Sequence, residues 1–257
     1  MLKGKIAIVT GGASGIGACV TRKLANSGST VVIACRDAEK AKKIVKEVKA
    51  NGGRSMWLKT DVTSATDCEK TVSATLESFG RVDILVHSSG ISSACKVIDM
   101  TDEIWDRTMD VNLKGALNIN LACIKSMSKM GYGRIVNIAS ISGKTPEWMN
   151  CAYCVSKAGV MMLTQCIALE QAANGIIANA VCPGPTNTRM MQQVLKERGA
   201  IEGMTATEYE KKFLADIPLK RMAEPEEVAE LVCFLVDDSA TYITGQCITI
   251  SGGKIWV

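Results

Sequence analysis

Short apolar runs alternate with longer helical patterns along almost the whole chain, and this alternation limits the fold more than any other feature. The apolar runs are Ile6–Val9, Val31–Ala34, Ser55–Leu58, Ile84–Val86, Ile135–Ile138, Ile176–Val181 and Cys247–Ile250. The helical patterns cover roughly Gly15–Ser27, Ala38–Ala50, Ala65–Phe79, Asp102–Lys129, Cys151–Ala173 and Pro225–Val236. Continuous apolar runs are typical of strands buried on both faces. The sequence therefore predicts an α/β fold, a doubly wound parallel sheet with helices on both faces.

One domain accounts for the length and composition. The chain has 257 residues, of which 47% are apolar, enough for a substantial core. It contains no Pro-rich, Gly/Ser-rich or charged linker and no repeat of fixed period. We expect a single domain over residues 1–257.

Charge and hydropathy exclude several classes of partner. The net charge is only +4, and basic and acidic residues are mixed, as in Ala38–Lys49. Without a basic block, no nucleic-acid partner is expected. No apolar run approaches the ~20 residues of a membrane span, so no membrane association is expected. Met1–Lys5 leads directly into a strand, and Gly253–Val257 matches no targeting signal, which together predict a cytoplasmic protein.

The eleven cysteines do not form a recognisable framework. Several lie in apolar runs (Cys19, Cys123, Cys166 and Cys233), which favours buried free thiols. Cys151 and Cys154 form one C-x-x-C pair, but a zinc site usually needs four ligands and the single His87 is distant in sequence. We expect no metal site.

A glycine-rich turn follows the first strand and opens the first helix. Its sequence is Thr10-Gly-Gly-Ala-Ser-Gly-Ile-Gly17. Glycine allows a sharp turn and close approach of a ligand, and free N–H groups at a helix start attract phosphate. A tight turn without a ligand is the alternative. The position of the turn favours a dinucleotide site, with contacts from Gly11, Ser14, Gly15, Ile16 and Gly17.

The second strand ends in a sequence that bears on the cofactor. An acid at its end usually binds the ribose of NAD, whereas a nearby arginine accepts the 2′-phosphate of NADP. Cys35 occupies the usual position of the acid, and Arg36 follows it. NADP(H) is therefore favoured over NAD(H). A surface role for Arg36, or Asp37 acting as the acid, remains open.

The third strand ends at Lys59-Thr60-Asp61-Val62. Strand ends of this kind line the ligand crevice, so Asp61 and Val62 are candidate cofactor contacts. Asp61 could accept a hydrogen bond from an adenine amino group. It could instead cap the helix that begins near Ser64.

Tyr153 and Lys157 lie four residues apart in a helical pattern and so share one helix face. A positive charge beside a phenol lowers its pKa, which would make Tyr153 a usable general acid or base. An ordinary buried tyrosine beside a surface lysine is the alternative, because the two-residue pattern alone is weak.

These motifs together resemble the short-chain dehydrogenase/reductase family. The resemblance rests on Thr10–Gly17, Asp61 and Tyr153–Lys157, and it extends from Lys5 to Gly253. It implies a seven-stranded Rossmann-type sheet and, often, a tetramer. It also implies hydride transfer between nicotinamide C4 and a ketone or secondary alcohol.

The resemblance implies further site residues. Asn112 matches the family's catalytic Asn, and Ser140 matches its catalytic Ser. Pro183-Gly184 matches the turn beside the nicotinamide, and the cofactor site is completed by Gly90, Thr186 and Thr188. By the same analogy, Tyr153 transfers the proton, Ser140 stabilises the carbonyl oxygen, Lys157 holds the ribose, and Asn112 holds a water that links Lys157 to solvent.

Two positions depart from the family pattern. His87-Ser-Ser-Gly90 stands where Asn-Asn-Ala-Gly is usual, and Ser251 replaces an Asp before the last Gly-Gly. His87 is expected to be a structural hydrogen-bonding group, with a pH-dependent contact beside the cofactor as the alternative. The effect of Ser251 is not predicted.

Segments 91–97, 142–149 and 185–213 are expected to line the substrate pocket. The last is expected to form a helical lid broken at Gly199 and Gly203, with a plain surface excursion as the alternative. The candidate pocket residues are Lys144, Glu147, Trp148, Met149, Met190 and Met191. The pattern is similar to reductases of small ketones, polyols and 3-oxoacyl groups, and does not separate them.

Apolar residues on more than one face of the helices at 102–129 and 151–173 predict burial against the sheet and against a second surface. The resemblance implies that this surface is the family's four-helix subunit interface, so we expect a homotetramer. A non-catalytic protein that senses NADP(H) is the main rival function. A serine hydrolase that uses Ser140 is less favoured, because the nucleophile elbow is missing. A sugar epimerase would carry a larger C-terminal domain.

Overall fold

The computed structural model describes residues 2–92 and 94–256. The strands are β1 (Ile6–Thr10), β2 (Thr30–Cys35), β3 (Arg54–Lys59), β4 (Ile84–His87), β5 (Gly133–Ile138), β6 (Ile176–Pro183) and β7 (Cys247–Ile250). The α-helices are α1 (Gly15–Asn26), α2 (Ala38–Ala50), α3 (Ala65–Phe79), α4 (Asp102–Met109), α5 (Gly115–Met130), α6 (Cys151–Gln171), α7 (Arg189–Ile201), α8 (Ala206–Ala215) and α9 (Pro225–Val236). Three predictions touch residues outside this description: Met1 and Val257 at the termini, and Ser93 in the pocket segment 91–97.

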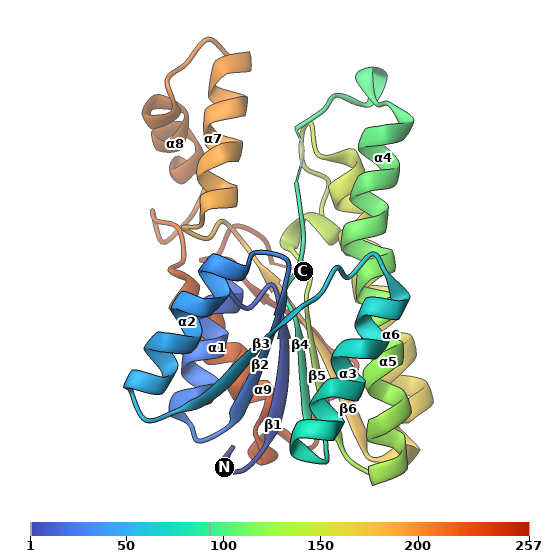
Figure 1. Cartoon of the computed structure of the whole chain (residues 1–257). Coiled ribbons are helices and arrows are strands. Elements are labelled where there is room, and N and C mark those ends of the chain that lie inside the picture. The colour runs from blue at the N-terminus through green and yellow to red at the C-terminus, as the bar shows by residue number, and fades with distance from the viewer. Residues whose placement is uncertain (1, 93, 257) are drawn as a thin grey trace.

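The strands form one parallel sheet in the order β3-β2-β1-β4-β5-β6-β7 (Figure 1). Every pairing between neighbouring strands is parallel. The chain changes direction across the sheet between β1 and β4, which is where ligands bind in folds of this kind. The predicted doubly wound, seven-stranded sheet is confirmed.

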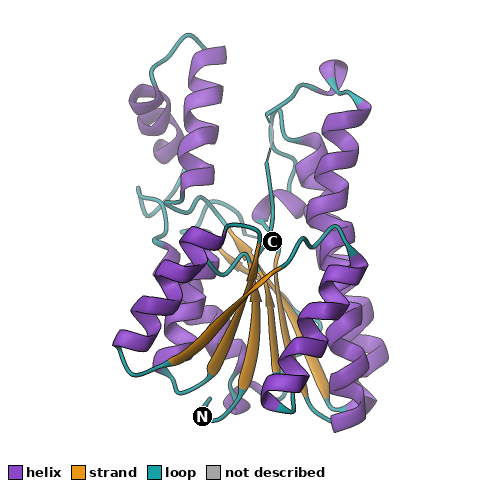
Figure 2. Ribbon diagram, viewed as in Figure 1, coloured by secondary structure: helices purple, strands orange, loops and turns teal. Residues whose placement is uncertain are grey.

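Helices cover both faces of the sheet (Figure 2). On one face α1 packs against α9, and a core that includes Val9, Leu24 and Val232 fills the space between helices and sheet. On the other face α3 packs against α5, and a second core includes Ile8 and Ile119. Both strand faces are therefore apolar, which explains the continuous apolar runs in the sequence.

Asp83 holds three strands together where they begin. Its fully buried carboxylate accepts a hydrogen bond from Ile6 N at 2.8 Å and pairs with Arg81. Its backbone N–H donates to Ile6 O, and its carbonyl accepts from Arg134 N, both at 2.9 Å. Asp83 thus fixes β4 between β1 and β5, the strands that flank the switch point.

The predicted helix over 102–129 is interrupted. A π-helical turn, Asp110–Lys114, separates α4 from α5. Asn112 lies in this turn and is fully buried. Gly115 follows, and a Cβ atom there would lie 2.7 Å from Val62 Cγ2. The helical path thus continues from α4 to α5 through one wider turn. Helical periodicity alone does not predict such a turn.

The burial of the cysteines differs in part from the sequence prediction. All eleven cysteines are free thiols, but Cys166 is exposed and Cys19 is only partly buried, unlike Cys123 and Cys233.

Of the described helices, the one at 151–174 is long and apolar enough to cross a membrane by length and composition alone, which is weak evidence for a span. It packs against β6, as a core helix of this fold would.

Replacing Asp83 with Ala is expected to lower the free energy of unfolding by about 2–5 kcal/mol, because Ile6 N and Arg81 lose their buried acceptor. Urea unfolding measures the change. Asp106→Ala, at an exposed position on α4, is the control and should alter stability by less than about 0.5 kcal/mol. Equal effects of the two substitutions would contradict the role given to Asp83.

Candidate active site

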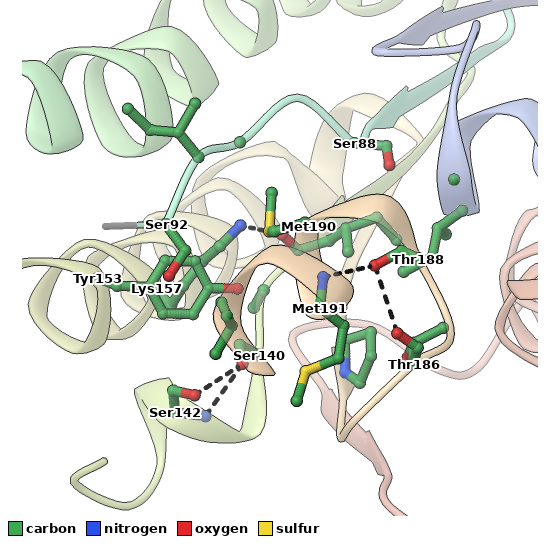
Figure 3. A pocket seen from close by; sticks show the side chains of 18 of the residues that line it. Ser88, Ser92, Ser140, Ser142, Tyr153, Lys157, Thr186, Thr188, Met190 and Met191 are labelled. Atoms are coloured by element: carbon green, nitrogen blue, oxygen red, sulfur yellow. Dashed lines mark hydrogen bonds between the residues drawn. The ribbon is translucent and has the colours of Figure 1, made fainter. Parts of the chain in front are cut away.

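A cavity of about 820 Å³ lies at the carboxyl ends of the central strands. Its wall runs from the glycine-rich turn before α1, past the ends of β4 and β5, to α6 and to α7 beyond β6. Side chains from these separate segments converge on it (Figure 3). Because the cavity spans the switch point between β1 and β4, it is the main candidate for the functional site.

The glycine-rich turn forms one end of the cavity, with Gly11, Ser14, Gly15 and Ile16 in its lining. Gly11 has a φ of 64°, and a Cβ atom there would lie 3.0 Å from Ser88 O. Ser14 is the N-cap of α1, and its side chain makes no capping hydrogen bond within the described residues. The first N–H groups of α1 are therefore available to a phosphate.

Gly17 does not line the cavity, contrary to the sequence prediction. A Cβ atom at this position would lie 2.4 Å from Gly11 O. Gly17 thus allows α1 to pack tightly against the turn. It lies behind the glycine-rich turn and supports the turn without lining the cavity.

The end of β2 presents basic side chains to the cavity. Arg36 and Lys40 both line it. Asp37 caps α2 by accepting from Lys40 N at 3.1 Å, and its other oxygen pairs with Lys40 Nζ. The carboxylate of Asp37 is therefore engaged, which weakens the alternative that it binds a ribose.

Asp61 and Val62 line the cavity beside Arg36. Asp61 accepts from Thr63 N at 3.0 Å and from Thr63 Oγ1 at 2.8 Å, and its other oxygen lies 3.7 Å from Arg36 Nη1. Ser64, not Asp61, caps α3, since its hydroxyl accepts from Asp67 N. The alternative of a helix-capping Asp61 is wrong.

Gly90 lines the cavity after β4, with Asn112 behind it. A Cβ atom at Gly90 would lie 3.3 Å from Asn112 Oδ1 and 3.4 Å from Lys157 Nζ. Asn112 exchanges hydrogen bonds with the backbone of Ile91, at 2.8 and 2.9 Å, and donates to Ser156 Oγ at 3.0 Å. Its side chain is committed to the scaffold and is absent from the cavity wall.

Tyr153 and Lys157 lie on one face of α6, and both line the cavity, as predicted (Figure 3). Lys157 Nζ lies 5.6 Å from the centre of the Tyr153 ring and donates to Ile138 O at 2.8 Å. Burial lowers the pKa of Lys157 to about 8.

The pKa of Tyr153 corrects the sequence analysis. Burial raises it to about 12, a hydrogen bond with Ser140 opposes part of this increase, and the charge of Glu147 adds to it. The predicted lowering is wrong for this arrangement, because loss of water around the phenolate outweighs the favourable contacts.

Ser140 is placed by the end of β5 and belongs to a chain of hydrogen bonds. Its Oγ lies 3.1 Å from Ser142 Oγ and accepts from Ser142 N at 3.1 Å. Ser142 Oγ donates to Glu147 Oε2 at 2.7 Å. Sequence reasoning assigned no function to Ser142 individually. Its position two residues after Ser140 in a tight turn carries no separate signal.

The segment after β6 forms the opposite wall, with Pro183, Gly184, Thr186 and Thr188 all in the lining. Thr186 Oγ1 donates to Gly184 O at 3.0 Å, and Thr188 Oγ1 donates to Thr186 O at 3.3 Å (Figure 3). Thr188 also caps α7 by accepting from Met191 N. These bonds hold the start of α7 against the cavity.

His87 is fully buried and faces Thr10. Thr10 Oγ1 already accepts from Ser88 N and Ser89 N, so it donates its proton to His87 Nδ1 at 2.9 Å. Burial, followed by the charge of Lys157, lowers the pKa of His87 to about 3. The ring is neutral near pH 7, which favours the structural role and contradicts a pH-dependent contact.

The substrate end of the cavity differs in part from prediction. Glu147, Trp148, Met190 and Met191 line it, but Lys144 and Met149 do not. Gly199 lies inside α7, so only Gly203, with a φ of 69°, marks a break before α8. Arg198 and Lys254 line the cavity and were missed. Arg198 looks like any charged residue of an amphipathic helix until its burial is known.

These features fit a bound nicotinamide dinucleotide. The glycine turn and the uncapped start of α1 suit its diphosphate, and Arg36 with Lys40 suits a phosphate on the ribose. Gly90 keeps the wall beside Lys157 free of a side chain.

Comparisons with known proteins agree with this geometry. A family model described as enoyl-(acyl carrier protein) reductase matches residues 11–254. An uncharacterized oxidoreductase of Thermotoga maritima is 37% identical over 252 residues, covering 98% of each chain. The 3-oxoacyl-(acyl-carrier-protein) reductase FabG of the same organism is 35% identical over 254 residues, covering 99% of each.

Solved structures give the same result. The structure of an actinorhodin polyketide ketoreductase variant with NADPH superimposes with a TM-score of 0.94, at 34% identity and 97% coverage of each chain. With the sheet order, the glycine turn and the Ser140, Tyr153 and Lys157 cluster, these matches show that the chain belongs to the short-chain dehydrogenase/reductase family of oxidoreductases.

Proposed function

We propose that this protein is an NADP(H)-dependent oxidoreductase that interconverts a small ketone and its secondary alcohol. The observation that carries the proposal is that Ser140, Tyr153 and Lys157 line the same cavity as the start of α1, which has no side-chain cap. A phosphate-binding end and a proton-donating end in one cavity suit a reaction between a dinucleotide and a carbonyl compound.

In the direction of reduction, the carbonyl carbon gains a hydride and the carbonyl oxygen gains a proton, giving the alcohol and the oxidised dinucleotide. The nicotinamide supplies the hydride when the cofactor is bound. The hydroxyl of Tyr153 donates to the oxygen as negative charge builds on it. Ser140 Oγ, which donates to Ser142 Oγ in this structure, joins it by turning its proton toward that oxygen. Tyr153 then transfers its proton, and its high pKa keeps that proton in place until the oxygen becomes basic.

Lys157 assists proton transfer from Tyr153 through its positive charge. Its charge favours the phenolate formed after proton transfer, at a distance of 5.6 Å from the ring centre. Burial makes the ammonium itself acidic, with a pKa of about 8. Lys157 can therefore return a proton to Tyr153, with Asn112 holding the backbone of Ile91 beside it.

Preference for NADP(H) over NAD(H) is supported by Arg36 and Lys40. Both line the cavity at the end of β2, where Cys35 replaces the acid that would repel a 2′-phosphate. One solved relative was determined with NADPH, and other relatives are named as 3-oxoacyl and ketoacyl reductases.

We infer that residues 185–213 act as a lid over the substrate end of the cavity.

We also infer that four copies of the chain assemble. Apolar side chains remain exposed on the outer faces of α5 and α6, among them Leu117, Leu121, Val155, Met162 and Leu169. Burying them against other copies would remove that surface from water. Within the proposed function, domain 1–257 is one catalytic unit.

A non-catalytic sensor of NADP(H) is the second candidate. It would bind the dinucleotide through the same turn and lack turnover. Against it stands the retention of the whole proton-transfer group, since Ser140, Tyr153 and Lys157 share one cavity wall.

Tyr153→Phe is expected to lower kcat for ketone reduction by roughly 10²- to 10⁴-fold, because the proton donor is removed. NADPH affinity, measured by fluorescence titration, should change by less than about threefold. The matched control is Tyr242→Phe, since that ring is fully exposed. Turnover retained in Tyr153→Phe would reject the assigned role.

Arg36→Met is expected to reduce the ratio of kcat/KM for NADPH to that for NADH by about ten- to a hundredfold, since a charge-assisted hydrogen bond contributes ~1.5–3 kcal/mol. Initial rates with both cofactors measure this ratio. Arg54→Met, at an exposed position at the start of β3, should leave it unchanged. A wild-type enzyme that prefers NADH would overturn the argument.

The rate of ketone reduction is expected to fall as pH rises through about 8, because the buried Lys157 ammonium then loses its proton. The fall in kcat/KM should approach tenfold per pH unit. A hydrogen bond with Cys182 lowers the pKa of Cys247, so this thiol is a second group that could titrate in the same range. Cys247→Ser is the control for this thiol, and it should show the same fall in rate with pH as the wild type if Lys157 causes it. A flat profile from pH 7 to 10 would show that Lys157 does not govern the reaction.

A further inference from the structure

The substrate end of the cavity contains charged groups that the proposed reaction does not use. Glu147 contributes from the segment before α6, Arg198 from α7, Asp216 from the end of α8, and Lys254 from the chain after β7. Phe213 lies among them. They come from four separate parts of the fold and meet only in the folded protein.

Arg198 is the most constrained of these groups. Its side chain is 3% exposed, and Nη1 donates to Glu147 Oε1 at 2.8 Å. Nε and Nη2 are also buried, and neither has a hydrogen-bond partner among residues 2–92 and 94–256. These two nitrogens form one edge of the guanidinium, with parallel N–H groups that match the two oxygens of a carboxylate. Leaving both donors unpaired is costly.

Glu147 does not satisfy that edge. Its oxygens already accept from Ser142 Oγ at 2.7 Å and from Asn150 Nδ2 at 2.9 Å, besides Arg198 Nη1. Burial alone would raise the pKa of Glu147, but the Arg198 charge and these hydrogen bonds lower it. Glu147 is therefore ionised and held in place, and it anchors one side of the guanidinium while leaving the buried Nε and Nη2 edge unpaired.

Lys254 adds a second cation nearby. Its Nζ lies 3.5 Å from the centre of the Phe213 ring. Burial lowers the pKa of Lys254, the charges of Glu147 and Asp216 oppose that change, and Arg198 adds to it. Asp216 is exposed to water, which screens its charge. An incoming anion thus meets two cations, Arg198 and Lys254. Of the two carboxylates nearby, Glu147 is already hydrogen-bonded and Asp216 is exposed to water.

This charged group is connected to the catalytic serine. The hydrogen-bond chain runs from Ser140 Oγ to Ser142 Oγ at 3.1 Å, to Glu147 at 2.7 Å, and to Arg198 at 2.8 Å. A single small molecule can therefore present a carbonyl oxygen to Ser140 and Tyr153 while a second substituent reaches Arg198.

We propose that the Nε and Nη2 edge of Arg198, assisted by Lys254, is a subsite for an oxyanion carried by the substrate. The substrate class is then a small ketone with an acidic group, foremost a carboxylate, whose two oxygens match the two donors. This inference rests on the proposed ketone reduction and specifies its substrate.

The first test compares keto acids of increasing chain length with their methyl esters, using NADPH. Two charge-assisted hydrogen bonds, each contributing ~1.5–3 kcal/mol, predict that the best acid exceeds its ester in kcat/KM by about 10²- to 10⁴-fold. The double variant Arg198→Met with Glu147→Gln removes the pair together and leaves no unpaired carboxylate. Its ratio of kcat/KM for the acid to that for the ester should fall toward one. Arg198→Lys keeps the charge but not the two parallel N–H donors, so its ratio should lie between those of the wild type and the double variant. A keto phosphate and its dephosphorylated form, treated in the same way, distinguish phosphate from carboxylate.

The second test measures binding without turnover. Malonate, added in the presence of saturating NADP⁺ so that the phosphate-binding groups are occupied, should raise the Tm of the wild type and not of the double variant. Lys196→Met, at an exposed position on the same helix, is the control and should behave as the wild type in both tests.

The outcomes separate this inference from the proposed function. If neutral ketones are reduced, acids show no preference and malonate does not bind, the oxyanion subsite is wrong and the reductase stands. If no ketone is reduced but malonate stabilises the protein only when Arg198 is present, the subsite stands and the proposed function is wrong.

Discussion

The ammonium of Lys157 is buried, and much of the site is arranged to hold it. Its Nζ donates to the backbone carbonyl of Ile138 at the end of β5. Two glycines allow close packing against this residue, Gly90 beside its ammonium and Gly143 against its backbone. A Cβ atom at Gly90 would lie 3.4 Å from Nζ, and one at Gly143 would lie 2.7 Å from the Lys157 carbonyl carbon. The second contact brings the turn after Ser140 directly against α6. The hydrogen bond of Lys157 and these two close contacts together bring β4, β5 and α6 near one another, and with them Ser140 and Tyr153.

The strands and most helices could be predicted from the sequence because their signals are local. A strand buried on both faces must be apolar throughout, and α2, α3 and α9 begin and end as their patterns indicate. The Tyr153 and Lys157 pair could be predicted for the same reason, since helical spacing alone places them together.

What failed depends on contacts between distant residues. The pKa of Tyr153 rises because burial dominates, and burial is a property of the folded cavity. Arg198 was missed because its partner Glu147 is 51 residues away. The π-helical turn at Asn112 depends on bonds to Ile91 and Ser156, across 21 and 44 residues. Family resemblance supplied Asn112 as a site residue but did not show that its side chain supports the site from behind.

The two ends of the cavity follow different physical rules. The end near α1 uses backbone groups and glycines, which are general for phosphate and leave little freedom for variation. The end near α7 uses side chains from α7, α8 and the segments before α6 and after β7, which can change without disturbing the sheet. Such a division lets one fold hold a constant cofactor while accepting different substrates. The buried Arg198 and Glu147 pair lies at this variable end.

Following labelled hydrogen tests the central claim most directly. NADPH carrying deuterium at the transferable C4 position would be incubated with the protein and a keto acid, and the product examined by NMR. Hydride transfer from the cofactor predicts deuterium on the carbinol carbon and a solvent-derived hydrogen on its oxygen. An alcohol without deuterium on that carbon, or bound NADPH that keeps its label while no alcohol forms, would contradict hydride transfer at this site.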